Sequence, residues 1–200
     1  MPKHSTTSSD RRAKEHHAVA YHEAGHAVAA WCKELKFRYV TVKPDAGAGS
    51  LGHVLCGFPK WFQPDVESSD RIRLHAERHI IVNFAGQHAE TRFRGKRPRY
   101  GMYRDNKQTV ELASYLFDLE ETMEAYLHYC FLASRDLVAT NWAAIKAVAA
   151  ALLERQTLSR RDVIEAIYPG STVPRKSLKR APAATTASDP GAVPPPPEHR

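Results

Sequence analysis

Cysteine is scarce in this chain of 200 residues, which contains only Cys32, Cys56 and Cys130. The number is odd, the three residues are widely spaced, and no C-x-x-C pair occurs. Neither a framework of disulfides nor a cysteine-based zinc knuckle is therefore expected. This cysteine usage predicts a reducing compartment, the cytoplasm.

Long apolar runs and nucleotide-binding glycine motifs are also missing. No stretch approaches the roughly 18 consecutive apolar residues that a membrane span needs, and the polar segment 1–14 contains no signal-peptide core. The phosphate-binding pattern G-x-x-x-x-G-K-[ST] does not occur, because Arg97 follows Gly95-Lys96 and no glycine precedes them at the needed spacing. We therefore expect a soluble chain that has neither a transmembrane segment nor an ATPase module.

The two ends of the chain differ in composition from its middle. Residues 1–14 are rich in Ser, Thr, Lys and Arg, and the chain beyond Pro169 is first basic, then rich in Ala and Thr, and finally proline-rich. Because such segments cannot bury enough apolar surface, we predict disorder at 1–14 and in the tail 170–200. One folded domain is predicted for residues 15–169, long enough to bury a core without disulfides.

The net charge of +7 is unevenly distributed, since six basic residues and no acidic one lie in the segment 92–104. We favour the interpretation of a solvated basic loop. The alternative is a basic rim that attracts acidic peptides, nucleic acid or an anionic membrane. Neither an interleaved aromatic stacking pattern nor a zinc-finger spacing lies beside it, so we do not expect nucleic acid as a partner.

The most informative motif is H-E-x-x-H, formed by His22, Glu23 and His26. On a helix, two histidines at this spacing share one face and can reach the same metal ion. Glu23 is then close enough to take a proton from a metal-bound water without being a ligand itself. The motif predicts a zinc hydrolase.

The residues around the motif favour a helix, which we predict from about His16 to Lys33. Alanine is frequent at 18–20 and 27–30 and is the strongest helix former. Gly25 is unfavourable inside a helix, so we expect another element to approach closely there. The alternative is an alanine-rich core helix with two incidental histidines.

Further elements follow from periodicity and capping signals. Two short strands are predicted at 39–42 and 52–56, joined by a glycine-rich connection. A long helix with Ser68, Ser69 and Asp70 as candidate caps is predicted to reach about Phe93 and to stop at Gly95. More helices are predicted from about Asp105, over about 119–154, and at 163–167 after a capping box at 159–162.

Several segments in this order resemble the peptidase domain of the membrane-anchored AAA zinc proteases, the FtsH family. The resemblance covers about residues 16–168, and its most specific parts are the metal motif and an Ala-Gly-x-x-Ala-Glu segment. The matching segments are 20–27, 50–54, 82–90, 105–108 with Leu112-Ala113, and 151–158.

The resemblance implies a mainly α, zincin-like metallopeptidase domain with a small β element. It also implies that zinc is held by His22, His26 and a distant aspartate, for which Asp105 matches. A carboxylate at a helix start can also simply cap the helix. Glu90, in the Ala-Gly-x-x-Ala-Glu match, could ligate zinc directly or orient a histidine, and we favour the orienting role.

Two rival ligand sets can be weighed from spacing. A metzincin-type third histidine should stand six residues after His26, beyond a helix-breaking glycine, but Cys32 and Ala29 occupy those two positions. His75 and His79 form a second pair with helical spacing, in the order H-x-E-x-H. Since this order has no match in the FtsH family, we interpret it as part of an amphipathic helix rather than as a ligand set.

We expect the chain to be a zinc-dependent endopeptidase that cleaves flexible or unfolded polypeptides without a motor of its own. It would then accept polypeptides that are already flexible, use the motor of another chain, or act on a narrow set of partners. The expected partners are polypeptide substrates and either further copies of the chain in a homo-oligomer or a separate motor protein. The strand at 52–56 could align a substrate by β-augmentation. The alternative function is a non-catalytic regulatory or protein-binding module that keeps the peptidase fold and its metal.

Overall fold

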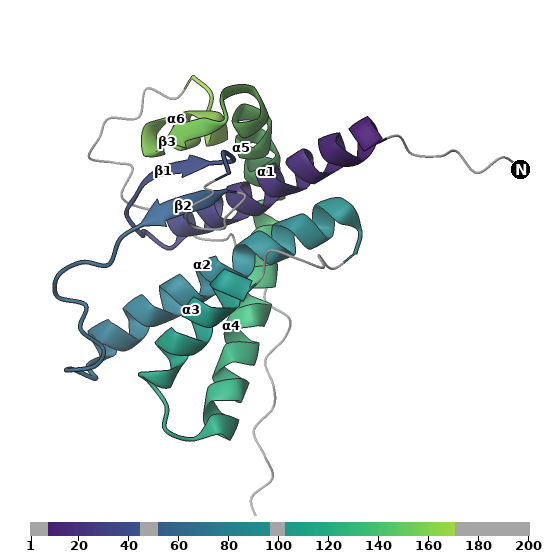
Figure 1. The fold of residues 1–200 in the computed structure, drawn as a ribbon. Coiled ribbons are helices and arrows are strands. Elements are labelled where there is room, and N and C mark those ends of the chain that lie inside the picture. Colours follow the sequence, from purple (N-terminus) through teal and green to yellow (C-terminus); the bar gives the residue numbers. More distant parts are fainter. Residues whose placement is uncertain (1–7, 45–51, 97–102, 171–200) are drawn as a thin grey trace, which may run out of the picture.

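The computed structural model describes residues 8–44, 52–96 and 103–170, and these form a mainly helical domain with a small sheet (Figure 1). The elements in chain order are α1 (Ser8–Cys32), β1 (Phe37–Thr41), β2 (His53–Cys56), α2 (Asp70–Arg94), α3 (Tyr103–Ser114), α4 (Glu120–Thr140), α5 (Trp142–Arg155), β3 (Thr157–Ser159) and α6 (Arg160–Ile167). The predicted fold class, mainly α with a small β element, is confirmed at this level. Residues 171–200, most of the predicted disordered tail, lie outside the described residues.

Helix α1 begins earlier than predicted. It starts at Ser8, so the prediction of disorder is wrong for residues 8–14, while residues 1–7 lie outside the described part. The first turns are exposed and the helix is buried from Ala18 onward. Once the buried half is ordered, each added turn costs no new nucleation, and this explains how a polar sequence continues the helix.

Helices α1 and α2 cross at a very short distance. A Cβ atom placed on Gly25 would lie 2.6 Å from the Ala85 carbonyl oxygen and 2.7 Å from the Ala89 Cβ. The expectation that another element approaches Gly25 closely is thus confirmed. The small residues of both helices allow the two backbones to meet, and the functional site lies along this crossing.

The three strands form an antiparallel sheet in the order β2-β1-β3. Val40 in the central strand pairs with Val54 of β2 and with Leu158 of β3. Strands β1 and β2 correspond to the predicted ones, whereas the three-residue β3 was not predicted because it is too short to show a period of two. The order leaves β2 at one edge of the sheet.

The remaining helices largely follow the prediction. Helix α2 ends at Gly95, whose φ of 69° is the left-handed conformation that glycine adopts easily. The predicted helical region 119–154 is divided into α4 and α5 at Asn141. Ser159 and Asp162 form the predicted capping box at the start of α6.

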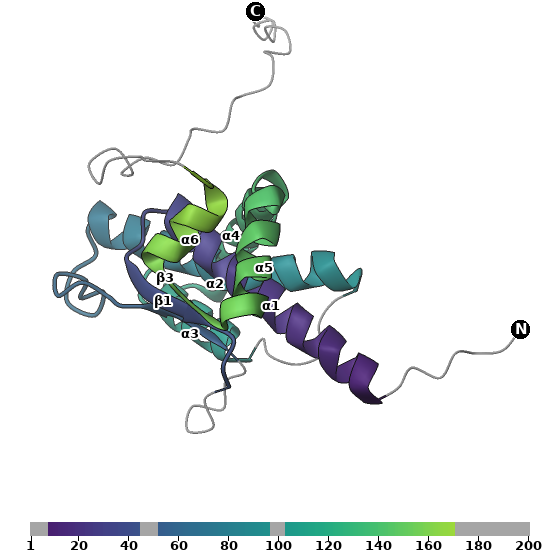
Figure 2. The same ribbon diagram turned by 90° about the horizontal axis from the view of Figure 1, so that it is seen from above.

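Helix α2 contributes residues to two apolar cores. In the ribbon it lies between α1 and α3 (Figure 1), and Figure 2 gives the view from above. The larger core joins α1, the sheet, α5 and α6, and it includes Val28, Val40, Ile145 and Leu158. The smaller core joins α2 to α3 and α4 around Ile80 and Ile81. The site is therefore held on helices that are packed from both sides.

Among the described helices, none alone has the length and apolar composition to cross a membrane. Helices α4 and α5 pass such a test only as a pair, with a bend of 77° between them.

Replacing Gly25 with alanine should destabilise the protein by about 1–3 kcal/mol, the range typical of overpacking, because the new methyl group would meet the backbone of α2. Urea denaturation of the metal-free protein measures this change. Gly57→Ala is the matched control, since a Cβ there meets nothing within 4 Å, and it should stay within about 0.5 kcal/mol of the parent. Equal effects of the two variants would contradict the close helix crossing.

Candidate metal centre

His22 and His26 present their Nε2 atoms to the same point from one face of α1. The two Nε2 atoms lie 3.0 Å apart, and the ring planes meet at 79°. One turn of helix separates the residues, so the spacing brings the rings together as the motif predicts.

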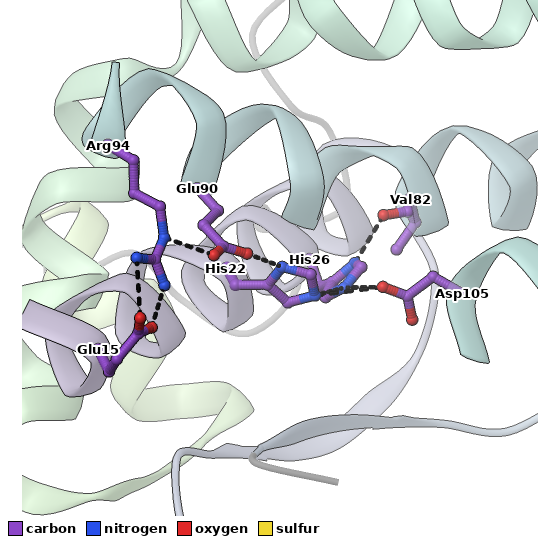
Figure 3. Close-up of polar contacts among 7 residues, drawn as sticks. All are labelled: Glu15, His22, His26, Val82, Glu90, Arg94 and Asp105. Atoms are coloured by element: carbon purple, nitrogen blue, oxygen red, sulfur yellow. Dashed lines mark hydrogen bonds and ion pairs between the residues drawn. The ribbon is translucent and has the colours of Figure 1, made fainter. Parts of the chain in front are cut away.

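Asp105, in the first turn of α3, completes a group of three donor atoms. Its Oδ2 lies 3.2 Å from His22 Nε2 and 3.3 Å from His26 Nε2 (Figure 3). With these three residues, the structure brings together the predicted metal ligands from helices that are far apart in the sequence. Two imidazoles and one carboxylate could hold a metal ion, and this donor set also occurs in catalytic zinc sites, where a fourth position stays open.

The separations of the three donor atoms fit those around a tetrahedral zinc ion. Donor atoms about 2.0–2.1 Å from a tetrahedral zinc ion stand about 3.3 Å from one another, and the observed separations are 3.0, 3.2 and 3.3 Å. The backbone of α2 leaves this space open at Gly86, where a Cβ would lie 2.3 Å from His26 Nε2 and 2.8 Å from His22 Nε2. A residue with a side chain there would collide with both histidine rings at their Nε2 atoms.

The other ring nitrogens have their own acceptors on α2. His26 Nδ1 donates to the Val82 carbonyl oxygen at 2.8 Å, and His22 Nδ1 donates to Glu90 Oε2 at 3.1 Å. Since each Nδ1 carries the proton in these contacts, each Nε2 is left as the atom that can bind a metal. Glu90 thus lies behind His22, the position that an orienting carboxylate requires, and away from the three donor atoms.

Glu23 is buried, and it lies close enough to His22 and His26 for their charges to act on it. Its side chain contacts the start of the sheet, because a Cβ on Gly52 would lie 2.8 Å from Glu23 Cγ and 2.9 Å from its Oε1. Its Oε2 is buried and has no hydrogen-bond partner within the described residues. Burial raises the pKa of Glu23, and the neighbouring His22 and His26 offset only part of that rise.

Without a metal, the charged groups of the site shift the pKa values of one another. Burial alone would lower the pKa of His22, but its hydrogen bonds to Asp105 and Glu90, together with the charges of Glu23 and Asp105, raise it to about 10. Burial would also lower the pKa of His26, but the effects of Asp105 and Glu23 together raise it. Burial would raise the pKa of Asp105, yet the two histidines hold it well below its usual range. In the absence of a metal, protons on the histidines compensate the carboxylates.

The rival ligands lie elsewhere. Cys32, at the end of α1, is not part of the donor group, and burial raises the pKa of its thiol to about 11. His75 and His79 pack against the rings of Phe58 and Phe62, and burial lowers the pKa of His79 to about 3. No carboxylate or thiol among the described residues joins this second pair to form a group of three ligands.

Sequence reasoning missed the residues behind Glu90. Arg94 donates to Glu90 and to Glu15, although it belongs to the segment that we predicted to be a solvated basic loop. Arg92 of that segment also lies in α2, with its guanidinium 4.5 Å from the Trp142 ring centre. The solvated-loop interpretation is wrong for these two residues, because both belong to the helix that we predicted to stop at Gly95. The spacing of four between Glu90 and Arg94 was a signal for their pairing, whereas no local pattern points to Glu15.

A comparison of the chain with models of known protein families gave no match, and a comparison with curated proteins gave none.

Zinc binding should release protons, because His22 and His26 hold protons in the metal-free protein and must lose them to bind a metal. A His22 pKa of about 10 means that zinc affinity rises as the pH increases toward that value. Near neutral pH we expect the release of about one to two protons per zinc ion. Calorimetric titration in two buffers of different ionisation enthalpy measures this number, and His22→Ala should lower it. Equal binding enthalpies in both buffers would contradict the assignment.

Proposed function

We propose that the protein is a zinc-dependent metalloendopeptidase similar to the peptidase domain of the FtsH family. The observation that carries the proposal is the convergence of His22 Nε2, His26 Nε2 and Asp105 Oδ2 within 3.3 Å of one another, beside a buried Glu23. A purely structural zinc site would usually close all four positions with protein ligands and has no use for a base.

Zinc held by His22, His26 and Asp105 would supply a Lewis acid that activates water and polarises the substrate carbonyl. Glu23 accepts a proton from a water molecule while the oxygen of that water attacks the carbonyl carbon. Glu23 then returns this proton to the amide nitrogen, so that the C–N bond breaks and an amine leaves. A raised pKa suits both steps, because the carboxylate must first bind the proton and then give it up.

The edge strand β2 is suited to hold the substrate. It pairs with β1 on one side only in the described sheet, and Gly52, directly before it, contacts Glu23. An extended peptide added to this edge would pass beside the site through main-chain hydrogen bonds that accept many side-chain sequences. Polypeptides that are already flexible are therefore the proposed substrates. A separate motor protein, or a homo-oligomer of this chain, could also supply folded proteins to the site.

Glu23→Gln should retain zinc and the native fold but lose peptidase activity by at least about 100-fold, the lower range for removal of a general base. The assay is cleavage of casein, with zinc content and melting temperature measured on the same samples. Glu111→Gln, on the exposed face of α3, is the matched control and should keep full activity. Zinc binding without cleavage by the parent protein would favour the alternative function, a metal-containing binding module.

The roles of Asp105 and Glu90 can be separated at limiting zinc. Asp105→Ala removes a metal bond and a negative charge, so the protein should lose zinc or hold it weakly. Glu90→Gln removes only the orienting charge behind His22 and should lower zinc affinity by about 10 to 100-fold. Competition with a chromophoric chelator measures both affinities. If Glu90→Gln empties the site while Asp105→Ala leaves it filled, Glu90 is the third ligand.

A further inference from the structure

A continuous series of charged contacts leads from His22 to the surface near the start of α1 (Figure 3). His22 Nδ1 donates to Glu90 Oε2 at 3.1 Å, and Arg94 Nε donates to Glu90 Oε1 at 2.7 Å. Arg94 also donates through both terminal nitrogens to the two oxygens of Glu15, with Nη1 at 3.3 Å from Oε1. Four side chains from two helices therefore form one connected set.

The orientation of Glu90 depends on having a partner for each oxygen. Its side chain is only 8% exposed, so solvent cannot hold the carboxylate in place. Arg94 fixes one oxygen from the adjacent turn of α2, and the other oxygen is then aimed at His22. A planar guanidinium with its donors in a fixed geometry does this better than a flexible ammonium group.

Glu15 completes the charge balance. Arg94 alone would neutralise Glu90 and so remove part of the negative charge that favours a metal ion bound to His22. The second carboxylate, from Glu15, compensates the guanidinium, and the set of Glu15, Arg94 and Glu90 keeps a net charge of −1. Glu15 stands seven residues, about two turns, before His22 in the same helix, so the contact also ties the exposed start of α1 to the end of α2.

We propose that Arg94 and Glu15 are positioning residues for the metal centre, which act on His22 only through Glu90. This inference rests on the proposed zinc site. Ordinary surface pairs differ from this set: Arg135 and Asp136 are 59% and 72% exposed, and within the described ranges their contact reaches no other charged group. Exposed pairs of that kind contribute little, and their loss should leave the metal centre unaffected.

Zinc affinity, measured by chelator competition on the full chain, is the direct test and does not depend on catalytic activity. Arg94→Gln should weaken zinc binding by about tenfold, the lower end of the range for groups that orient a ligand. Arg94→Lys should recover part of this loss, because an ammonium can hold Glu90 but cannot contact both carboxylates equally. Arg135→Gln is the matched control, with no change expected.

Glu15→Gln should weaken zinc binding by about threefold, since Glu15 is 60% exposed and its interaction is screened by solvent. The effect of Glu15→Gln on zinc affinity must depend on the presence of Arg94. When Arg94→Gln is already present, adding Glu15→Gln should leave zinc affinity unaltered. When Glu90→Gln is already present, adding Arg94→Gln should also leave zinc affinity unaltered. A purely structural role would lower the melting temperature of the metal-free protein but would not produce this dependence.

The outcomes separate the two proposals. If the parent protein binds no zinc, the proposed function fails and this inference fails with it. If the parent binds zinc tightly and Arg94→Gln binds it equally well, only the inference is overturned. Additive losses in the double variants would also overturn it, because they would mean that Arg94 and Glu15 act independently of Glu90.

Discussion

The close crossing of α1 and α2 is the constraint on which the other features of the site depend. Gly25 removes the side chain that would keep the helices apart, and Gly86 removes the one that would fill the space beside the histidine nitrogens. Only at this separation can His22 reach Glu90 and His26 reach the Val82 carbonyl oxygen. The same small residues thus serve packing and ligand orientation, because α2 supplies both the opposing surface and the acceptors.

The crossing also concentrates charge in a place from which water is largely excluded. His26, Glu23 and Glu90 are all buried, and ionised groups are costly to bury unless each has a partner. Without a metal, protons on His22 and His26 compensate the carboxylates, as the raised pKa values of both histidines indicate. A divalent cation in their place would supply the same positive charge, so the arrangement of charges favours exchange of protons for metal.

Much of this arrangement follows from local sequence and the rest from contacts between distant residues. Helical spacing within the H-E-x-x-H motif is enough to place His22 and His26 together, and Gly25 by itself indicates a close neighbour. Asp105 was expected only through the resemblance, because no local pattern connects residues 83 positions apart. The first turns of α1 were predicted wrongly because their polar composition resembles that of a disordered segment. Glu15 differs from the other exposed polar residues near it only through its contact with Arg94, which is far along the chain.

Glu23 is the residue that best distinguishes a reactive centre from a merely structural one. A buried carboxylate oxygen without a partner is destabilising, by about 1–3 kcal/mol or more for a charged group, and the Oε2 of Glu23 is such an atom within the described structure. Departures of this kind from good packing are expected where a residue serves chemistry. The proposed peptidase mechanism would account for the cost of Glu23, because in that mechanism this carboxylate accepts a proton from water.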